Sequence, residues 1–370
     1  MKALLCGGGT AGHVIPAVAI ADALVKRDSS TTVKFIGRLG GNECDIIKKR
    51  GYSLSEIKIQ GLSRKIGIKS LKSIYFAIEA LRAARKIIKE FKPDVIIGTG
   101  GYVCWPVLSA GKFMHIPTVI HESNATPGLT TRLLASGASS VLLSVKECAQ
   151  KLPKAKKICV VGTPSLNDFD RYTKSEARKK LGIMQNDFFI VSFGGSGGAE
   201  ALNSASIALM KSYSARMSGV KHLHATGKSY YEKIKDAEPL FAGGKDGCKI
   251  VPYIDNMPEV MKAADIVISR CGAMTLAEIC MTGNVGILIP SPNVTDNHQY
   301  ENAKHLSDMG AAVLIEEKDL SLRHLLDTVG MLHNDTGRMK KMSEISKSLA
   351  TPGAENLIVD EIYRVSQTRH

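Results

Sequence analysis

The chain has 370 residues, 44% hydrophobic and 23% charged, and its formal net charge is +14. This composition excludes a disordered or fibrous chain and is typical of a globular protein with two domains of ordinary size. The longest apolar runs have the length of strands, so no membrane-spanning helix is expected. The eight cysteines include no Cys-x-x-Cys pair, and we therefore expect reduced, mostly buried thiols in the cytoplasm and no zinc site.

The positive charge is concentrated in the first part of the chain. Residues 1–160 contain 25 Lys and Arg but only 10 Asp and Glu, so this part carries the whole excess. Such asymmetry predicts that the first half meets an anionic partner: nucleic acid, a membrane surface or a charged substrate.

Five short apolar runs in the first half end in glycine or polar residues: KALLCGG, TVKFIG, DVIIGTG, PTVIHES and SSVLLSV. Helix-length segments lie between them, for example residues 70–91. Alternation of this kind predicts strands of a parallel sheet joined by helices.

The first of these strands runs into CGGGTAGHVIP, residues 6–16, which contains the G-x-G-x-x-G pattern of a dinucleotide-binding loop. His13 and Pro16 are unusual there, and the second strand ends at Arg38 without the carboxylate that grips an NAD ribose. An NADP-dependent enzyme, with Arg38 near a 2′-phosphate, remains an alternative at this point.

The second half repeats the pattern with FFIVSFGGS, GVKHLHATG, CKIVPYI, DIVISRCG and VGILIPSP. The segment KICVVGTPSLNDFD separates the two series of strands, so we predict two doubly wound α/β domains. The first covers residues 1–162 and the second 163–351. A C-terminal helix at about 352–370 is a candidate to pack back on the first domain.

Two features of the second half are typical of phosphate binding. Gly194–Gly198 is a glycine loop after a strand, and Gly272–Thr275 opens a helix whose unpaired N–H groups and dipole favour a pyrophosphate. Glu278, within the first turns of that helix, is placed to accept hydrogen bonds from a ribose diol. Farther on, SPNVTDNHQYENA supplies polar side chains on a predicted loop suited to sugar hydroxyls: Asp296, Asn297, Gln299 and Asn302.

Six motifs, in order and spread over nearly the whole chain, resemble the MurG family of glycosyltransferases. They are GGTAGHVIPA, GTGGYVCWP, VIHESNATPGLTTRLLA, GGSGGAEALN, PYIDNMPEVMKAADIVISRCGAMTLAEI and PSPNVTDNHQYENA. Members of this family add N-acetylglucosamine from UDP-N-acetylglucosamine to a lipid-linked muramyl pyrophosphate during peptidoglycan synthesis.

The resemblance implies the GT-B fold, with two Rossmann-like domains facing a cleft, the acceptor on the first and the donor on the second. It also implies an inverting single displacement that converts lipid I into lipid II, with no required metal and no cofactor, since UDP-N-acetylglucosamine is a substrate. Expected partners are the polyprenyl-pyrophosphoryl muramyl peptide, an anionic membrane surface and, as candidates, other cell-wall synthesis proteins. No nucleic acid is expected.

The resemblance also assigns donor contacts to individual residues. Ile254 resembles the residue whose backbone reads uracil, Ser196 a diphosphate contact, Glu278 the ribose ligand and Gln299 a donor-sugar contact. The resemblance places the phosphate site at the helix start on four residues of this chain, Ala273, Met274, Thr275 and Leu276. In the family, residues of the first domain reach the donor when the cleft closes. The resemblance assigns this contact to Thr10, Ala11, Gly12 and Asn124.

The acceptor loop corresponds to Gly100, Gly101 and Tyr102. A base must take the proton of the muramyl hydroxyl, and His13 is the first candidate because imidazole titrates near neutral pH. A structural histidine that holds the loop is an equally good interpretation of His13. Glu122, whose pKa could be raised by desolvation, is the second candidate for the base.

Some positions depart from the family pattern. Leu166 stands where the family usually has an arginine, which removes a charged phosphate contact, and Trp105 lies beside the acceptor loop. Another GT-B transferase, acting on a glycolipid or natural product, is therefore the alternative function, with a non-catalytic carbohydrate-binding relative as a third.

Residues 61–93 combine many basic side chains with apolar ones. Ile74, Ile78, Leu81 and Ile88 recur at helical spacing and are expected to face the core. The apolar residues left over lie among the positive charges: Leu62, Ile66, Ile68, Tyr75 and Phe76. This pattern predicts a peripheral protein on the cytoplasmic face of the membrane, bound by lysines such as Lys65, Lys69 and Lys72.

Overall fold

The computed structural model describes residues 1–41, 43–59, 68–214, 219–245 and 247–368. The chain divides into two compact units. The first comprises Met1–Leu166 together with Thr351–His370, and the second comprises Asn167–Ala350.

The first unit is built on a seven-stranded sheet in the order β3-β2-β1-β4-β5-β6-β7, in which every neighbouring pair is parallel. The strands are β1 (Lys2–Cys6), β2 (Thr32–Arg38), β3 (Ser53–Ile57), β4 (Val95–Gly98), β5 (Thr118–Glu122), β6 (Ser140–Leu143) and β7 (Ile158–Val160). The five strands expected in this half are confirmed. The sequence did not reveal β3, whose pattern is polar, or β7, which lies inside the segment interpreted as the separator.

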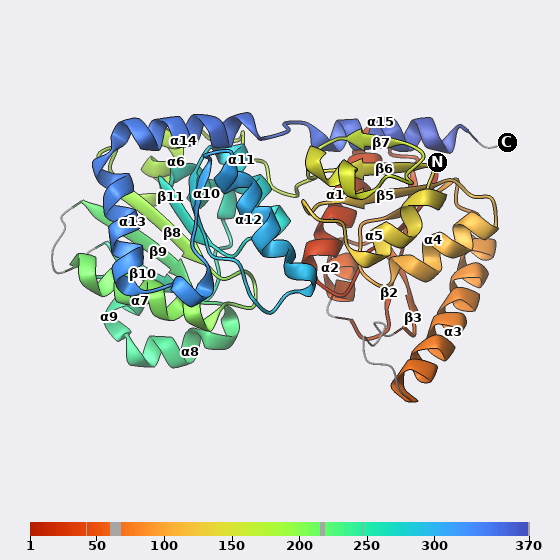
Figure 1. Cartoon of the computed structure of the whole chain (residues 1–370), viewed down its shortest axis with the longest axis horizontal. Coiled ribbons are helices and arrows are strands. Elements are labelled where there is room, and N and C mark those ends of the chain that lie inside the picture. The colour runs from red at the N-terminus through yellow and green to blue at the C-terminus, as the bar shows by residue number, and fades with distance from the viewer. Residues whose placement is uncertain (42, 60–67, 215–218, 246, 369–370) are drawn as a thin grey trace. The chain divides into compact units, whose positions relative to one another are not determined.

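Helices cover both faces of this sheet (Figure 1). They are α1 (Ala11–Arg27), α2 (Glu43–Lys49), α3 (Ile68–Phe91), α4 (Cys104–Phe113), α5 (Leu129–Leu134) and α15 (Ala354–Ser366). Because side chains alternate along a strand, Ala3 and Leu5 of β1 face the core under α1 and α15, while Leu4 and Cys6 face the core under α3 and α4.

Helix α15 belongs to the first unit although it follows the second in the chain. Ile358 and Ile362 are fully buried in the core shared with α1. Glu361 accepts hydrogen bonds from Arg364 at 2.7 Å and from Lys157 at 3.0 Å. The Arg364 guanidinium chiefly lowers the pKa of this carboxyl to about 2, so α15 is held by burial and by a charged hydrogen-bond cluster.

The second unit has a six-stranded parallel sheet in the order β10-β9-β8-β11-β12-β13. Its strands are β8 (Phe188–Phe193), β9 (Val220–Ala225), β10 (Cys248–Val251), β11 (Ile266–Ser269), β12 (Val285–Leu288) and β13 (Ala312–Leu314). All five strands expected in this half are confirmed, and β13 is a three-residue edge strand that the sequence did not indicate.

Its helices again pack on both faces of the sheet (Figure 1). They are α6 (Lys174–Leu181), α7 (Glu200–Ser214), α8 (Lys228–Ala237), α9 (Pro239–Gly243), α10 (Met257–Ala263), α11 (Ala273–Thr282), α12 (His298–Asp308), α13 (Leu322–Asn334) and α14 (Thr336–Ser348). Short 3-10 segments are η1 (Ala135–Gly137), η2 (Lys146–Lys151), η3 (Thr295–Asn297) and η4 (Glu317–Asp319).

The order of strands reverses once in each sheet, between β1 and β4 in the first and between β8 and β11 in the second. Ligands of open α/β sheets bind at such a switch point, outside the carboxyl ends of the strands. The loops there are residues 7–10 and 99–103 in the first unit, and residues 194–199 and 270–272 in the second. The topology therefore selects the glycine loops that the sequence indicated.

Helix α3 differs from the expectation at one position. Leu81 is partly buried and Ile88 fully buried, but Ile78 is 46% exposed and lies outside the core. Because residues three or four apart share a helix face, Ile78 lies on the same side as Tyr75, which is 63% exposed. Leu62, Ile66 and Lys65 lie outside the described residues, as do the side chains of residues 68–74, which include Ile68, Lys69, Lys72 and Ile74.

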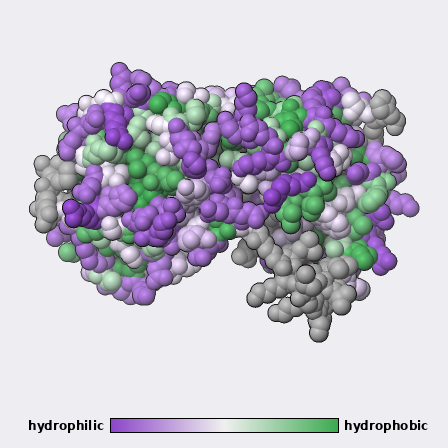
Figure 2. Space-filling view, viewed as in Figure 1, coloured by the Kyte–Doolittle hydropathy of each residue, from purple (hydrophilic) through white to green (hydrophobic). Residues whose placement is uncertain are grey.

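No helix among the described residues is both long and apolar enough to cross a membrane. On the face shown in Figure 2, hydrophilic side chains dominate and hydrophobic ones gather in separate patches on each unit.

Candidate active site

The first turn of α1 brings His13 back onto the glycine loop that follows β1. Thr10 is the N-cap with an extended backbone, and Ala11 and Gly12 open the helix. His13 Nδ1 lies 3.1 Å from the carbonyl oxygen of Gly8 and 3.3 Å from Thr10 Oγ1. Because a carbonyl oxygen can only accept, Nδ1 carries a proton, and Nε2 is the basic nitrogen of the neutral ring.

The loop after β4 packs against this histidine. A Cβ on Gly100 would lie 2.6 Å from His13 Cδ2, and one on Gly101 would lie 1.9 Å from the carbonyl oxygen of Gly8. Both glycines have positive φ, 110° and 82°. Only glycine tolerates this backbone with so close an approach. Tyr102 follows half-buried, so the predicted acceptor loop and the predicted base are adjacent.

Glu122, at the end of β5, accepts four hydrogen bonds. Its Oε1 accepts from the backbone N–H and side-chain amide of Asn124, at 3.1 and 2.9 Å. Its Oε2 accepts from the backbone of Gly128 at 3.1 Å and from Thr131 Oγ1 at 2.7 Å. Glu122 is 5% exposed, so this arrangement orders the loop between β5 and α5 and orients the Asn124 amide.

The start of α11 is an uncapped helix N-terminus in the second unit. Gly272 is the N-cap, with extended backbone and no capping side chain among the described residues. Ala273, Met274 and Thr275 follow half-exposed, and their N–H groups belong to the first turn, where no intrahelical acceptor exists. Leu276 differs, because its side chain is buried and its N–H donates to the Gly272 carbonyl at 3.1 Å. Its amide is therefore already used within the helix.

Glu278 lies farther along α11, where one of its oxygens is held. Oε1 accepts from the Asn167 side-chain amide at 2.9 Å, while Oε2 has no partner among the described residues. Burial raises the pKa of the carboxyl to about 7, against the lowering effect of Asn167. A desolvated carboxylate with a vacant acceptor is suited to hydroxyl donors.

Gln299 and Asn302 lie on α12, and the expectation of a loop was wrong for these two residues. Gln299 Oε1 accepts from the backbone N–H groups of Cys271 at 3.2 Å and Ser291 at 3.0 Å. Because both partners are donors, the amide orientation is determined and Nε2 remains a donor. Asn302 Nδ2 donates to the Cys271 carbonyl at 3.3 Å. The two amides thus clamp the turn that precedes the α11 N-cap.

The glycine loop after β8 presents Ser196 on an exposed turn. Gly195 and Gly198 have positive φ, 88° and 76°. A Cβ on Gly198 would lie 2.2 Å from the Thr226 carbonyl oxygen, so this loop contacts the loop after β9 backbone to backbone.

Ile254 lies between β10 and α10 with its side chain 4% exposed in the core beside Val260 and Met261. Its backbone N–H and C=O have no hydrogen-bond partner among the described residues. The residue is anchored by its side chain and presents its backbone, as a base-reading position requires.

The sequence did not single out two residues that contact the site. Thr99 Oγ1 donates to the His13 carbonyl at 2.7 Å, and Asn167 holds Glu278. Each lies where a strand or linker ends, and the polar residue in DVIIGTG was the only signal for Thr99. Leu166, at the position of the family arginine, packs against the apolar core of the first unit.

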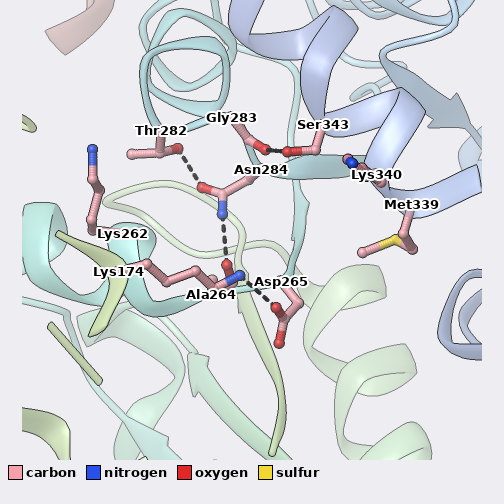
Figure 3. A pocket seen from close by; sticks show the side chains of 10 residues that line it. All are labelled: Lys174, Lys262, Ala264, Asp265, Thr282, Gly283, Asn284, Met339, Lys340 and Ser343. Carbon is pink, nitrogen blue, oxygen red and sulfur yellow. Dashed lines mark hydrogen bonds and ion pairs between the residues drawn. The ribbon is translucent and has the colours of Figure 1, made fainter. Parts of the chain in front are cut away.

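A cavity with a volume of about 250 Å³ lies elsewhere in the second unit. Asp265 and Asn284 directly precede β11 and β12, so the cavity is at the amino ends of the strands, opposite the loops above. Its lining includes Lys174, Lys262 and Lys340, and Lys174 pairs with Asp265 at 2.6 Å (Figure 3). Helices α10 and α11 end beside it, where their dipoles are negative, and lysines are favourable at such helix ends. We therefore assign no catalytic role to this cavity.

Two parallel-sheet units with glycine loops at their switch points are consistent with the GT-B fold class. The family models "Glycosyltransferase family 28 N-terminal domain" and "Glycosyltransferase family 28 C-terminal domain" match residues 3–143 and 189–358. The chain belongs to glycosyltransferase family 28. This assignment decides the interpretation of the first glycine loop against the NADP-dependent alternative.

The relatives narrow the class to the MurG group and confirm the resemblance. A protein of Caldanaerobacter subterraneus is 41% identical over 372 residues, covering 100% of both chains, and one of Acetivibrio thermocellus is 37% identical over 369 residues, covering 100% and 99%. Both are named UDP-N-acetylglucosamine–N-acetylmuramyl-(pentapeptide) pyrophosphoryl-undecaprenol N-acetylglucosamine transferase. The crystal structure of Acinetobacter baumannii MurG matches with a TM-score of 0.77 and 26% identity, covering 98% and 99%.

Proposed function

We propose that this protein transfers N-acetylglucosamine, with inversion, from UDP-N-acetylglucosamine to the muramyl sugar of a polyprenyl-pyrophosphoryl muramyl peptide. The observation that carries the proposal is the full-length similarity to relatives that share this one name. The arrangement of Glu278, Gln299 and the α11 N-terminus around one switch point supports it.

The donor binds, on this proposal, along the carboxyl edge of the second sheet. The Ile254 backbone reads the uracil, and Glu278 accepts from the ribose hydroxyls through Oε2, the oxygen that Asn167 leaves open. Ser196 and the N–H groups of Ala273 to Thr275 bind the diphosphate, where the helix dipole favours negative charge. Gln299 Nε2 donates to the sugar, because its Oε1 is held by two backbone groups.

The acceptor binds at the loops of the first unit, with Gly100, Gly101 and Tyr102 beside His13. The muramyl hydroxyl oxygen attacks the anomeric carbon while the bond from that carbon to the phosphate oxygen breaks. The hydroxyl proton passes to His13 Nε2, the nitrogen left basic by the Nδ1 hydrogen bond to Gly8. The electron pair leaves with UDP, whose charge the α11 N-terminus stabilises.

Glu122 is better suited to positioning than to proton transfer. Each of its two oxygens already accepts two hydrogen bonds. To take a proton, Glu122 would have to give up one of these four hydrogen bonds. We therefore assign the base to His13 and assign Glu122 to holding Asn124, which reaches the donor on this proposal.

We further propose that the first unit binds the cytoplasmic face of an anionic membrane. The contact is made by a stripe of exposed side chains along one side of α3. Tyr75, Ile78, Arg82, Arg85 and Lys89 recur at intervals of three and four residues, and all five are exposed. The stripe is apolar at its start and basic thereafter, and each basic residue near an anionic surface contributes about 1 kcal/mol. A lipid-linked acceptor, whose pyrophosphate lies at headgroup level, requires such contact.

The reaction itself is tested with radiolabelled UDP-N-acetylglucosamine and a short-chain analogue of the muramyl lipid. We expect label in the lipid product with inverted configuration at the anomeric carbon. Transfer to unrelated glycolipids but not to this analogue would favour the alternative GT-B transferase.

Glu278→Ala should weaken binding of UDP and UDP-N-acetylglucosamine together, by about 1.5–3 kcal/mol, the contribution of a charge-assisted hydrogen bond. Titration calorimetry measures this. Since diol donors favour the ionised carboxylate, wild-type binding near pH 7 should also release protons from Glu278, to an extent that the variant loses. Lys340→Ala is the control and should bind UDP normally, because Lys340 lines the cavity at the amino ends of the strands. Equal affinity of the Glu278 variant and wild type would reject the ribose assignment.

His13→Ala should lower kcat by ~10²–10⁴-fold, the usual contribution of a general base, with UDP affinity little changed. His115, an exposed histidine of the same unit, provides the control variant His115→Ala. Glu122→Gln should disturb donor KM more than kcat. Full loss of turnover in Glu122→Gln with normal turnover in His13→Ala would exchange the two roles.

Arg82→Glu with Lys89→Glu should abolish sedimentation with anionic vesicles and spare UDP binding, because the basic end of the stripe is reversed. Wild-type binding should fall with added salt. Lys262→Glu with Lys340→Glu in the second unit makes the same charge change and should leave vesicle binding intact. Equal binding of wild type to neutral and anionic vesicles would contradict the electrostatic account.

A further inference from the structure

Four buried polar side chains under the Gly194–Gly198 loop form one continuous chain of hydrogen bonds. Ser192 on β8, His222 and His224 on β9 and Asn203 on α7 are 0, 1, 0 and 2% exposed. None of them is among the proposed donor contacts.

The links of the chain are short. Ser192 Oγ lies 2.7 Å from His222 Nε2 and 2.7 Å from His224 Nδ1. His224 Nε2 lies 3.1 Å from Asn203 Oδ1, and Asn203 Nδ2 donates to the Thr226 carbonyl at 3.0 Å. Strand register explains the first two links, because Ile190 pairs with His222 and Ser192 with His224, and alternate residues share a face.

The Thr226 carbonyl determines which group donates and which accepts in each of these hydrogen bonds. The Thr226 carbonyl can only accept, so Asn203 presents its nitrogen there and its oxygen to His224. His224 must then carry its proton on Nε2 and accept at Nδ1 from the Ser192 hydroxyl. That hydroxyl has one proton, so its oxygen accepts from His222 Nε2. All donors therefore point toward Thr226, and both rings are Nε2–H tautomers.

Burial keeps both rings neutral. Desolvation holds the pKa of His222 well below its ordinary value and lowers that of His224 to about 4. A neutral ring has one donor and one acceptor nitrogen, as the direction above requires of His224.

The chain of hydrogen bonds ends at the Thr226 carbonyl, where the loop after β8 meets the loop after β9. The Thr226 carbonyl oxygen lies 2.2 Å from where a Cβ on Gly198 would be, and a Cβ on Gly227 would lie 2.5 Å from Gly198 Cα. Asn203 belongs to the first turn of α7, the helix that the Gly194–Gly198 loop enters. The chain therefore ties the end of β8, the start of α7 and the end of β9 to one another.

Apolar side chains of similar size would fill this space without the cost of desolvating four polar groups. A directed polar chain adds a single defined position for the Thr226 carbonyl relative to α7. We propose that Ser192, His222, His224 and Asn203 are positioning residues that hold the Gly194–Gly198 loop in the conformation that binds the donor diphosphate. This inference rests on the proposed function, in which that loop contacts the diphosphate.

The test compares a ligand with phosphates and one without. Ser192→Ala breaks the chain in its middle, and it should weaken UDP and UDP-N-acetylglucosamine binding about five- to tenfold, the effect of one hydrogen bond. Binding of uridine, measured by competition or NMR titration, should change less than about twofold. In turnover, KM for the donor should rise while kcat and KM for the acceptor stay near wild type.

Ser206→Ala is the matched control. Ser206 lies on α7 one turn after Asn203, is fully buried, and has a hydroxyl without a partner among the described residues. The variant makes the same serine-to-alanine substitution at a residue that takes no part in the chain of hydrogen bonds, and it should bind UDP as wild type does. Equal losses in the two variants, or equal losses for uridine and UDP, would overturn the positioning role. A wild type that binds neither UDP nor UDP-N-acetylglucosamine would instead refute the proposed function.

The direction of the chain is tested in the wild-type protein, which keeps the inference falsifiable if Ser192→Ala does not fold. Long-range proton–nitrogen NMR should show His222 and His224 as Nε2–H tautomers at pH 7. An Nδ1–H tautomer or a charged ring at His224 would overturn the inference.

Discussion

The close approach of adjacent loops at the carboxyl edge of each sheet is the constraint on which the rest of the site depends. In the first unit the position of a Cβ on Gly101 is 1.9 Å from the Gly8 carbonyl oxygen, and in the second that on Gly198 is 2.2 Å from the Thr226 carbonyl oxygen. No other residue fits at either place. Each contact brings backbone from two strands together at or beside a switch point, and the groups we propose to be functional are built on it.

Amide side chains do much of the remaining positioning, because each carries a donor and an acceptor in one rigid plane. Gln299 and Asn302 hold the N–H and C=O of Cys271, and Asn203 joins His224 to the Thr226 carbonyl. When one end of an amide meets a backbone group of known polarity, the polarity of the other end is determined. The same logic leaves Gln299 Nε2 with protons to donate and leaves His13 Nε2 as the unprotonated nitrogen of the neutral ring.

Burial and hydrogen-bond partners together give similar residue types different properties here. Glu278 and Glu122 are both glutamates near loops at the carboxyl edge, but Glu278 has one held oxygen and a pKa raised to about 7, while Glu122 accepts four hydrogen bonds. His222 and His224 are held neutral by desolvation. A residue's type is therefore a poor guide to its role until the groups around it are known.

The sequence by itself determined the fold class and the family. Apolar β-branched runs ending in glycine identified ten of the strands, since these patterns record local propensity and burial. The strands it missed, β3, β7 and β13, are short or polar edge strands whose pairing comes from their neighbours. Only the tertiary structure decided that Ile78 is exposed, that Gln299 lies on a helix, and that Ser192, Asn203 and two histidines form one chain. The exposure of Ile78 and the hydrogen bonds of the histidines depend on contacts between residues far apart in the sequence, and no local pattern carries them. Gln299 lies on a helix because α12 begins directly after Asn297, whose left-handed backbone conformation the sequence pattern did not reveal.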